Sequence, residues 1–232
     1  MHSVRTTVVA FFAGLAVLSV TACAAAFGDR YQEAVHTRVG ESPAMLHVED
    51  SVGDVTVLAW KQPYVQIDAV KKGPSEDAVH AITISVQPSG SRLDVVAHLG
   101  SDSDRRSVDF TIHAPAAAAV SVDASVGKID IEGVAHDVEA TADVGEVTVV
   151  MASLGKGQHV DLKSSVGKID LTIPHDADAA IEADTSVGSV KGNVPFALTR
   201  SVVGAQGSAT IGSGTAGVHL TTSTGSINVD RE

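Results

Sequence analysis

The chain has 232 residues, with 28 acidic and 16 basic side chains, one cysteine and only 3% aromatic residues. The excess of negative charge and the scarcity of rings argue against nucleic acid as a partner, since they leave neither a basic surface for phosphates nor a platform for bases. A single cysteine excludes internal disulfides and thiolate zinc clusters. With 44% hydrophobic residues, the chain is too apolar for disorder and suits one domain with a core.

Residues 1–22 are predicted to be a signal peptide. Arg5 precedes an apolar run over residues 8–22, which is too short and too rich in Ser and Thr to span a bilayer stably. We therefore expect the chain to be exported to the cell envelope.

The end of this run resembles the bacterial lipobox. Val20-Thr21-Ala22-Cys23 places small residues before the only cysteine, and in lipoproteins that cysteine is acylated and becomes the new N-terminus. The resemblance implies a lipid anchor on Cys23, and Ala24 after it implies transfer to the outer membrane. An ordinary cleavage site at residues 22–24 or 24–26 is the alternative, and it would release an unanchored secreted protein.

Residues 23–40 are predicted to be a linker, and residues 41–230 a β-strand repeat domain. Its first recognisable unit is the motif Ser51-Val52-Gly53-Asp54-Val55. Residues 60–115 lack this motif and are predicted to form a small antiparallel sheet inserted after the first unit. The insertion contains four apolar alternating runs, at residues 65–70, 81–86, 92–99 and 108–114.

Two further signals lie inside the insertion. Residues 88–90 read Pro-Ser-Gly and predict a turn between the second and third strands. Residues 73–76 are expected to cap a short helix that ends at His80.

Residues 116–230 are predicted to be repeat coils. The motif recurs there at intervals of 18 to 22 residues, which is the period of a solenoid. A glycine at the centre of each copy is predicted to sit at a bend between two strands, where a left-handed backbone or the close approach of the next coil excludes a Cβ atom. These bend glycines are Gly53, Gly127, Gly145, Gly167, Gly188, Gly207 and Gly225.

Apolar and polar residues alternate on both sides of each glycine. Around Gly167, the apolar positions are Val160 and Leu162 before it and Ile169 and Leu171 after it. Such alternation is typical of half-buried strands. Consecutive hairpins would give an antiparallel sandwich, whereas stacked coils of two strands would give a parallel β-solenoid. Identical residue types at identical registers favour the all-β parallel solenoid, because stacking places each residue above its counterpart.

These segments together resemble a bacterial family of β-strand repeat domains of unknown function known as "putative adhesin". The resemblance rests on the opening at residues 48–57, on Trp60, on the line at 108–115 and on the coil at 120–133, and it covers roughly residues 40 to 230. It implies a β-helical envelope domain with no established catalytic residues, so no site residue is implied.

The polar residues show little sign of metal or nucleophilic chemistry. The acidic segments 102–104 and 175–178 offer oxygen ligands for calcium, but neither has the spacing of a known calcium loop. No Gly-x-Ser-x-Gly elbow occurs. The histidines are scattered without the short spacings of metal ligands, at His36, His47, His80, His98, His113, His136, His159, His175 and His219. We predict no catalytic residue, cofactor or metal.

One outward column suggests a binding surface. Glu139, Asp161 and Glu182 each lie six residues before a bend glycine, so a solenoid in chain order stacks them on three consecutive coils as an acidic stripe. Screened carboxylates that keep the sheet soluble are one interpretation. The other is a binding site for a cationic partner: a divalent ion, a basic peptide or an amine-bearing envelope component.

The sequence therefore predicts a non-catalytic envelope protein, adhesin-like, that binds along the solenoid surface. A β-helical glycan-cleaving enzyme and a structural envelope spacer are the alternatives. The enzyme would need paired carboxylates and aromatic subsites in one groove.

Overall fold

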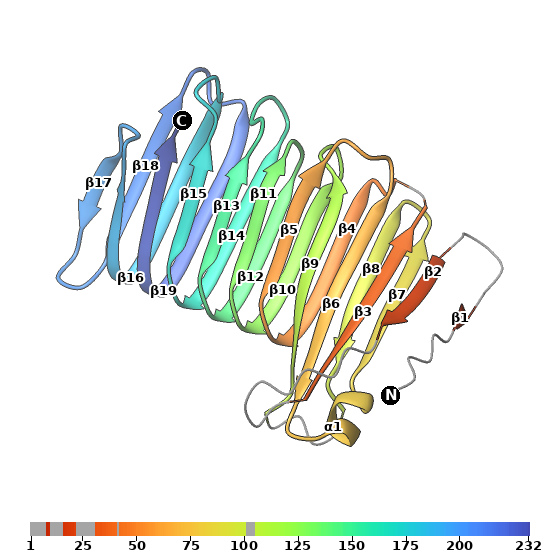
Figure 1. Cartoon of the computed structure of the whole chain (residues 1–232). Coiled ribbons are helices and arrows are strands. Elements are labelled where there is room, and N and C mark those ends of the chain that lie inside the picture. Colours follow the sequence, from red (N-terminus) through yellow and green to blue (C-terminus); the bar gives the residue numbers. More distant parts are fainter. Residues whose placement is uncertain (1–7, 10–15, 22–30, 41, 101–104) are drawn as a thin grey trace.

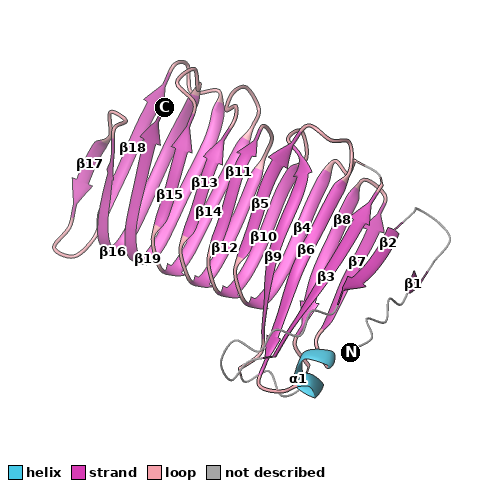
Figure 2. Ribbon diagram, in the orientation of Figure 1, coloured by secondary structure: helices cyan, strands magenta, loops and turns pink. Residues whose placement is uncertain are grey.

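A computed structural model of the whole chain describes all residues except 1–7, 10–15, 22–30, 41 and 101–104 (Figure 1). Almost every described element is a strand, and the short α1 (Glu76–His80) is capped at its N-terminus by Ser75, as the sequence predicts (Figure 2). No helix in these described ranges has the length and apolar character to cross a membrane.

The strands are β1 (Val8–Val9), β2 (Ala16–Thr21), β3 (Tyr31–Val39), β4 (Met45–Val52), β5 (Val55–Trp60), β6 (Val65–Gly73), β7 (Thr83–Ser89), β8 (Arg92–His98), β9 (Ser107–Pro115), β10 (Ala119–Val126), β11 (Ile129–Val134), β12 (Val138–Val144), β13 (Val147–Met151), β14 (His159–Val166), β15 (Ile169–Ile173), β16 (Ala179–Gly192), β17 (Ala197–Arg200), β18 (Ala205–Ile211) and β19 (Ala216–Arg231).

The strands form two sheets, and each coil passes from one sheet to the other at its bend. This arrangement confirms the predicted solenoid. The pre-bend sheet runs β7-β8-β4-β10-β12-β14-β19-β16-β18-β17. The post-bend sheet runs β1-β2-β3-β6-β9-β5-β11-β13-β15-β19-β16. Because β16 and β19 continue through their bends, each belongs to both sheets. The central pairings are parallel and place bend above bend along one edge.

The bends are formed by glycines in close contact with the neighbouring coil. A Cβ atom on Gly53, Gly127, Gly145, Gly167, Gly225 or Gly188 would lie 1.7 to 1.9 Å from a backbone carbonyl oxygen of the adjacent coil. No side chain fits that gap, which is why glycine is present at each of these bends.

The last coils do not follow chain order, contrary to the stacking that the sequence predicts. After β15 the chain enters β16 at the far end, turns back through β17 and β18, and returns as β19. β19 inserts between β14 and β15 on one side and β16 on the other. Every copy carries the same pattern, so any two coils can stack equally well and spacing alone cannot identify neighbours.

Gly207 is a second correction, because it is not a bend glycine. It lies within β18, antiparallel to β16, where Phe196, Val190 and Leu198 crowd the space beside its Cα. The turn nearest the last bend is formed instead by residues 201–204, where the carbonyl of Val203 accepts a 2.8 Å hydrogen bond from the amide of Gly188.

The N-terminal part also differs from its prediction. Residues 31–39 of the predicted linker form β3, whose Val35, Thr37 and Val39 are buried against the core. β3 pairs with β6 on one side and on the other with β2, which lies in the predicted signal peptide. Alternation within β3 is the signal that identifies it as a strand.

The predicted antiparallel insertion at residues 60–115 is only partly antiparallel. β6 and β7 pair antiparallel with β9 and β8. β8 and β9 themselves pair parallel with β4 and β5, because they begin the stack that the repeat coils continue. Within the insertion, β8 and β9 therefore extend the solenoid at its N-terminal end, next to the coil of Gly53.

Apolar ladders fill the space between the sheets. One ladder runs through the residues two positions after each bend glycine, all at most 3% exposed: Val55, Ile129, Val147, Ile169, Ile227 and Val190. Like side chains pack above like, so each layer supports the next.

We expect Ile169→Ala to lower the free energy of unfolding by about 2 to 5 kcal/mol, because it removes buried methyl groups and leaves a cavity. Lys168 is the matched control, since its side chain is 48% exposed and pairs with Asp170. Lys168→Ala should cost less than about 0.5 kcal/mol. Denaturant titrations of both variants measure the difference, and equal losses would contradict the register.

Candidate functional site

The outward face of the pre-bend sheet, here called the polar face, contains the predicted acidic stripe. In register along this face lie His47, Ser121, Glu139, Asp161, His219, Glu182 and Ser208. Glu139 and Asp161 are direct neighbours. The expected succession of three carboxylates on consecutive coils is wrong, however, because β19 places His219 between Asp161 and Glu182.

Two of the three stripe carboxylates lie beside a basic side chain, one beside a lysine and the other beside a histidine. Asp161 accepts a 2.8 Å hydrogen bond from Lys163, and this bond raises the pKa of the lysine above its ordinary value. Glu182 lies 3.3 Å from Nδ1 of His219. Glu139 forms no ion pair within the described part of the chain. The stripe is thus a row of mixed charge whose negative centre is the pair Glu139 and Asp161.

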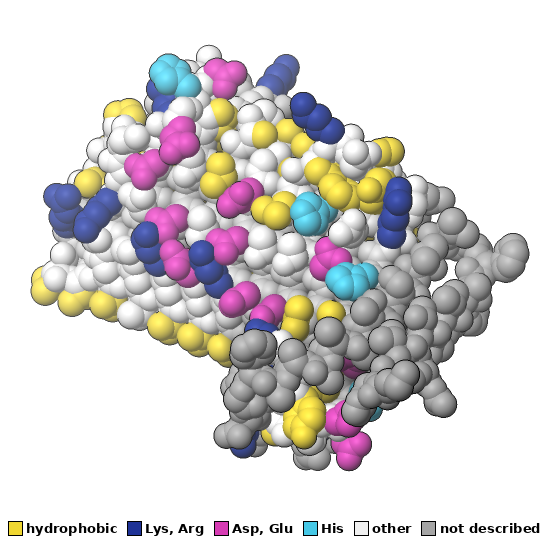
Figure 3. Space-filling view, viewed as in Figure 1, with side chains coloured by type: hydrophobic (Ala, Val, Ile, Leu, Met, Phe, Trp, Pro, Cys, Tyr) yellow, Lys and Arg dark blue, Asp and Glu magenta, His cyan; other side chains and the backbone are white. Residues whose placement is uncertain are grey.

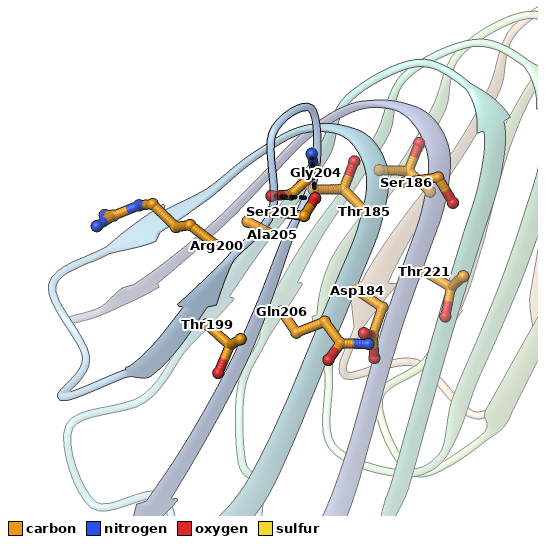
Figure 4. Close-up of a pocket in the computed structure, with 11 residues that line it drawn as sticks. Asp184, Thr185, Ser186, Thr199, Arg200, Ser201, Gly204, Ala205, Gln206 and Thr221 are labelled. Atoms are coloured by element: carbon orange, nitrogen blue, oxygen red, sulfur yellow. Dashed lines mark hydrogen bonds between the residues drawn. The ribbon is translucent and has the colours of Figure 1, made fainter.

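The polar face ends in an open hollow of about 520 Å³ at the C-terminal end of the solenoid (Figure 4). Across its floor, Thr221, Asp184, Gln206 and Thr199 stand side by side on β19, β16, β18 and β17. Figure 4 shows Gln206 and Asp184 with their side-chain ends close together and Arg200 extending away from them. The turn at its rim is closed by the amide of Gly204, which donates a 2.9 Å hydrogen bond to Oγ of Ser201.

This hollow offers hydroxyl, amide, carboxylate and guanidinium groups to a polar ligand. Asp184 is the single carboxylate among the residues that line it. Hydrolysis of a glycosidic bond uses a pair of carboxyl groups on either side of the bond. The groups that line the hollow are donors and acceptors of hydrogen bonds.

The sequence offered two acidic segments, residues 102–104 and 175–178, as possible calcium ligands. Residues 102–104 lie outside the described residues. In the second segment, Oδ1 of Asp178 accepts hydrogen bonds from the amides of Ser213 and Thr215, at 2.7 and 3.2 Å. Desolvation opposes its ionisation, but these bonds hold the pKa of Asp178 below its ordinary value. Asp178 thus orders a loop, and the described part of the chain groups no three His, Cys, Asp or Glu side chains that could hold a metal.

Sequence reasoning missed an inward column three residues before each bend glycine. Ser164, Thr185 and Thr222 each donate a hydroxyl hydrogen bond, of 3.0 to 3.2 Å, to a glycine carbonyl of the neighbouring coil. These bonds cross-link the bends. Alignment of the copies on their glycines would have revealed the column, because small or hydroxyl residues recur there.

Asp50 occupies this same column in the first coil, in register with Ala124. It is 2% exposed, and neither carboxylate oxygen forms a hydrogen bond of ordinary geometry with the described residues. Desolvation raises the pKa of Asp50 to about 7, and the nearby charges of Asp109 and Asp54 add to the shift, while the amides of Val52 and Ser51 oppose it in part. A protonated carboxyl group can donate a hydrogen bond as the hydroxyls of this column do.

Cys23, the predicted anchor, lies outside the described residues. β3, which begins at Tyr31, is the first described strand after Cys23.

Comparison with known proteins gives a family and a fold. The family model described as Toastrack DUF4097 matches residues 46–230. A crystal structure described as a "putative cell adhesion protein" from Clostridium sporogenes ATCC 15579 has a TM-score of 0.64 at 13% identity, covering 87% of this chain and 100% of that chain. A "putative adhesin" from Bacteroides fragilis NCTC 9343 has a TM-score of 0.36 at 15% identity, covering 86% and 97% of the two chains. No curated protein is significantly similar to the chain.

Proposed function

The chain belongs to the Toastrack DUF4097 family, and on that premise we propose that it is a non-catalytic, adhesin-like protein of the cell envelope that binds a partner along its polar face. The observation that carries the proposal is the polar face itself, a long register of outward polar side chains that ends in an open hollow. The description of the Clostridium sporogenes protein as a "putative cell adhesion protein" supports the same interpretation.

The chemistry of the face favours a cationic partner. The whole chain has a formal charge of -12, and the neighbouring carboxylates of Glu139 and Asp161 repel one another in the free protein. A basic peptide, a divalent ion or an amine-bearing envelope component would relieve that repulsion.

Binding to a basic peptide at low ionic strength tests the proposal. We expect the variant Glu139→Gln/Asp161→Asn/Glu182→Gln to bind at least about tenfold more weakly than the parent, because the attraction of clustered charges is lost. The free variant should also unfold at a slightly higher temperature.

An equal change of charge elsewhere provides the control. Glu76→Gln/Asp77→Asn/Glu132→Gln alters three exposed carboxylates that lie off the polar face. If both triple variants bind as the parent does, the stripe is only a solvated surface. If both weaken equally, net charge rather than the polar face determines binding.

We further propose that Cys23 anchors the exported protein in the outer membrane. A single acyl chain binds membranes only marginally, and lipoproteins carry more than one. The mature protein is therefore expected to partition into detergent, and mass spectrometry should find acyl chains on Cys23. An unmodified N-terminus at Ala24, Ala25 or Phe27 would overturn the anchor and indicate a freely secreted protein.

A further inference from the structure

An exposed row of valines runs along the bend edge of the solenoid. The residue before the bend glycine is Val126, Val144, Val166 or Val187 in four coils, and each is 47 to 50% exposed. With Val52 of the first coil, which is half-buried and packs against the core, these residues form what we call the valine ridge, about 24 Å long at the usual strand spacing. Figure 3 shows a row of hydrophobic side chains along the lower edge of the solenoid, with charges of both signs on the sheet above it.

The fold does not require valine at these positions. Thr224 occupies the same ladder between Val166 and Val187 and is exposed. A polar β-branched residue is therefore compatible with the bend. Apolar side chains that recur in solvent without serving the core are typical of an interaction surface.

Charged residues flank the ridge in an alternating order. The residue after the bend glycine is Asp54, Lys128, Glu146 and Lys168 in four successive coils. In the two coils beyond them, the same position holds Ser226 and Ser189. The signs along this column are therefore minus, plus, minus, plus, followed by two neutral residues.

Because of this order, the bend edges of two copies of the chain have complementary charges when they meet in one particular alignment. A two-fold axis perpendicular to the sheets, between the coils of Gly127 and Gly145, sets Lys128 opposite Glu146 of a second copy. The same axis sets Asp54 opposite Lys168 of the second copy, and both pairs occur twice by symmetry. A shift by one coil opposes like charges instead. A two-fold axis along the solenoid opposes the charged column to the column before the bends, which is serine except for Asp143 and offers no alternating charges.

We propose that the valine ridge and its flanking charges form a dimer contact with a second copy of this chain, with the two solenoids antiparallel. Val126 packs against Val144 of the second copy at the centre, and the alternating charges select the register. The contact uses the bend edge, so it leaves the polar face of each copy uncovered and does not depend on the proposed function.

Disulfide trapping in cells tests the contact with the full-length chain. Two differently tagged copies are co-expressed, one with Val126→Cys and the other with Val144→Cys, and cells are oxidised with a copper complex. A disulfide needs Cα atoms closer than about 7 Å, so only the proposed register brings these positions together. We expect at least about fivefold more cross-linked heterodimer than from two Val126→Cys copies, which are offset by about one strand spacing.

The parent, whose only cysteine is Cys23, and Ala152→Cys on the opposite edge are the controls. Cross-linking from Val126→Cys with Val144→Cys that does not exceed these controls would overturn the proposal. Equal cross-linking at all ridge positions would overturn the register, because it would indicate random collision.

Charge exchange provides a second, independent readout. Lys128→Glu in both copies places glutamates opposite Glu146, so trapping should fall at least about fivefold. Lys128→Glu/Glu146→Lys restores opposite signs across the two-fold axis and should return trapping to near the parental level. A double variant that remains as weak as the single one, with an unchanged melting temperature, would contradict the charge pairing.

Discussion

Gly145→Ala is expected to destabilise the protein by on the order of 4 kcal/mol or more, enough to leave the solenoid largely unfolded. The new Cβ would lie 1.7 Å from the carbonyl oxygen of Gly127. The two coils would have to separate, which would break the 3.0 Å hydrogen bond that the amide of Gly127 donates to the carbonyl of Val144 and disturb the packing above and below. Circular dichroism and thermal unfolding measure the effect.

Gly155→Ala is the matched control. Gly155 lies in the loop at the opposite edge of the same coil, and no atom beyond its two neighbours in the chain lies within 4 Å of the position of its Cβ. Its replacement should change stability by less than about 0.5 kcal/mol. A Gly145→Ala variant as stable as Gly155→Ala would show that the bends are not in contact.

Asp50 is expected to make stability fall as the pH rises from about 4 to about 8. Its pKa is about 7 in the folded protein against an ordinary value of 3.8. Between these values the folded state holds a proton that the unfolded state has released, so each step up in pH favours unfolding. The full shift corresponds to about 4 kcal/mol, which is present as stability below the lower pKa and lost above the higher one.

Asp50→Ser should remove this pH dependence of stability. The serine supplies a hydroxyl group in place of the protonated carboxyl group, as Ser164 does at the same position of its coil. We expect the variant to exceed the parent in stability at pH 8 and to approach it at pH 4, as measured by denaturant titration across that range. Asp143→Asn changes an exposed carboxylate nearby and should leave the slope as it is in the parent. Identical slopes for Asp50→Ser and the parent would contradict a neutral buried acid.

The solenoid could be predicted from sequence because its repeat is local. Each copy carries its own glycine and its own alternation, so Ile169 and Val147 indicate the same bend without reference to each other. Burial of both at 0% exposure follows from stacking like on like.

The order of the last coils could not be predicted for the same reason. A ladder of similar residues accepts any similar neighbour. The spacing of Gly188 and Gly225 therefore does not show that β19 lies between β16 and the preceding coil. The prediction of a continuous acidic stripe was wrong for this reason. It assumed that the coils stack in chain order, whereas His219 of β19 lies between Asp161 and Glu182.

The roles of Gly207 and Asp50 depend on three-dimensional contacts that an alignment of the repeats does not show. Gly207 fits the spacing of a bend glycine, yet the antiparallel return of β18 places it under Phe196 and Leu198. Asp50 is acidic where other coils have Ala, Ser or Thr, and its significance emerges only once the column is seen to point inward.

Binding along the polar face is the central claim, and site-specific photo-cross-linking tests it most directly. Thr141 lies on the polar face beside Lys163, whereas Thr148 lies on the outward face of the other sheet, and both are half-buried. A photo-reactive amino acid is placed at one or the other, and the protein is illuminated on isolated envelopes at low and high salt. We predict adducts from position 141 that high salt suppresses, and few from position 148. Equal adducts from both positions, or none from either, would contradict the claim and favour a structural spacer.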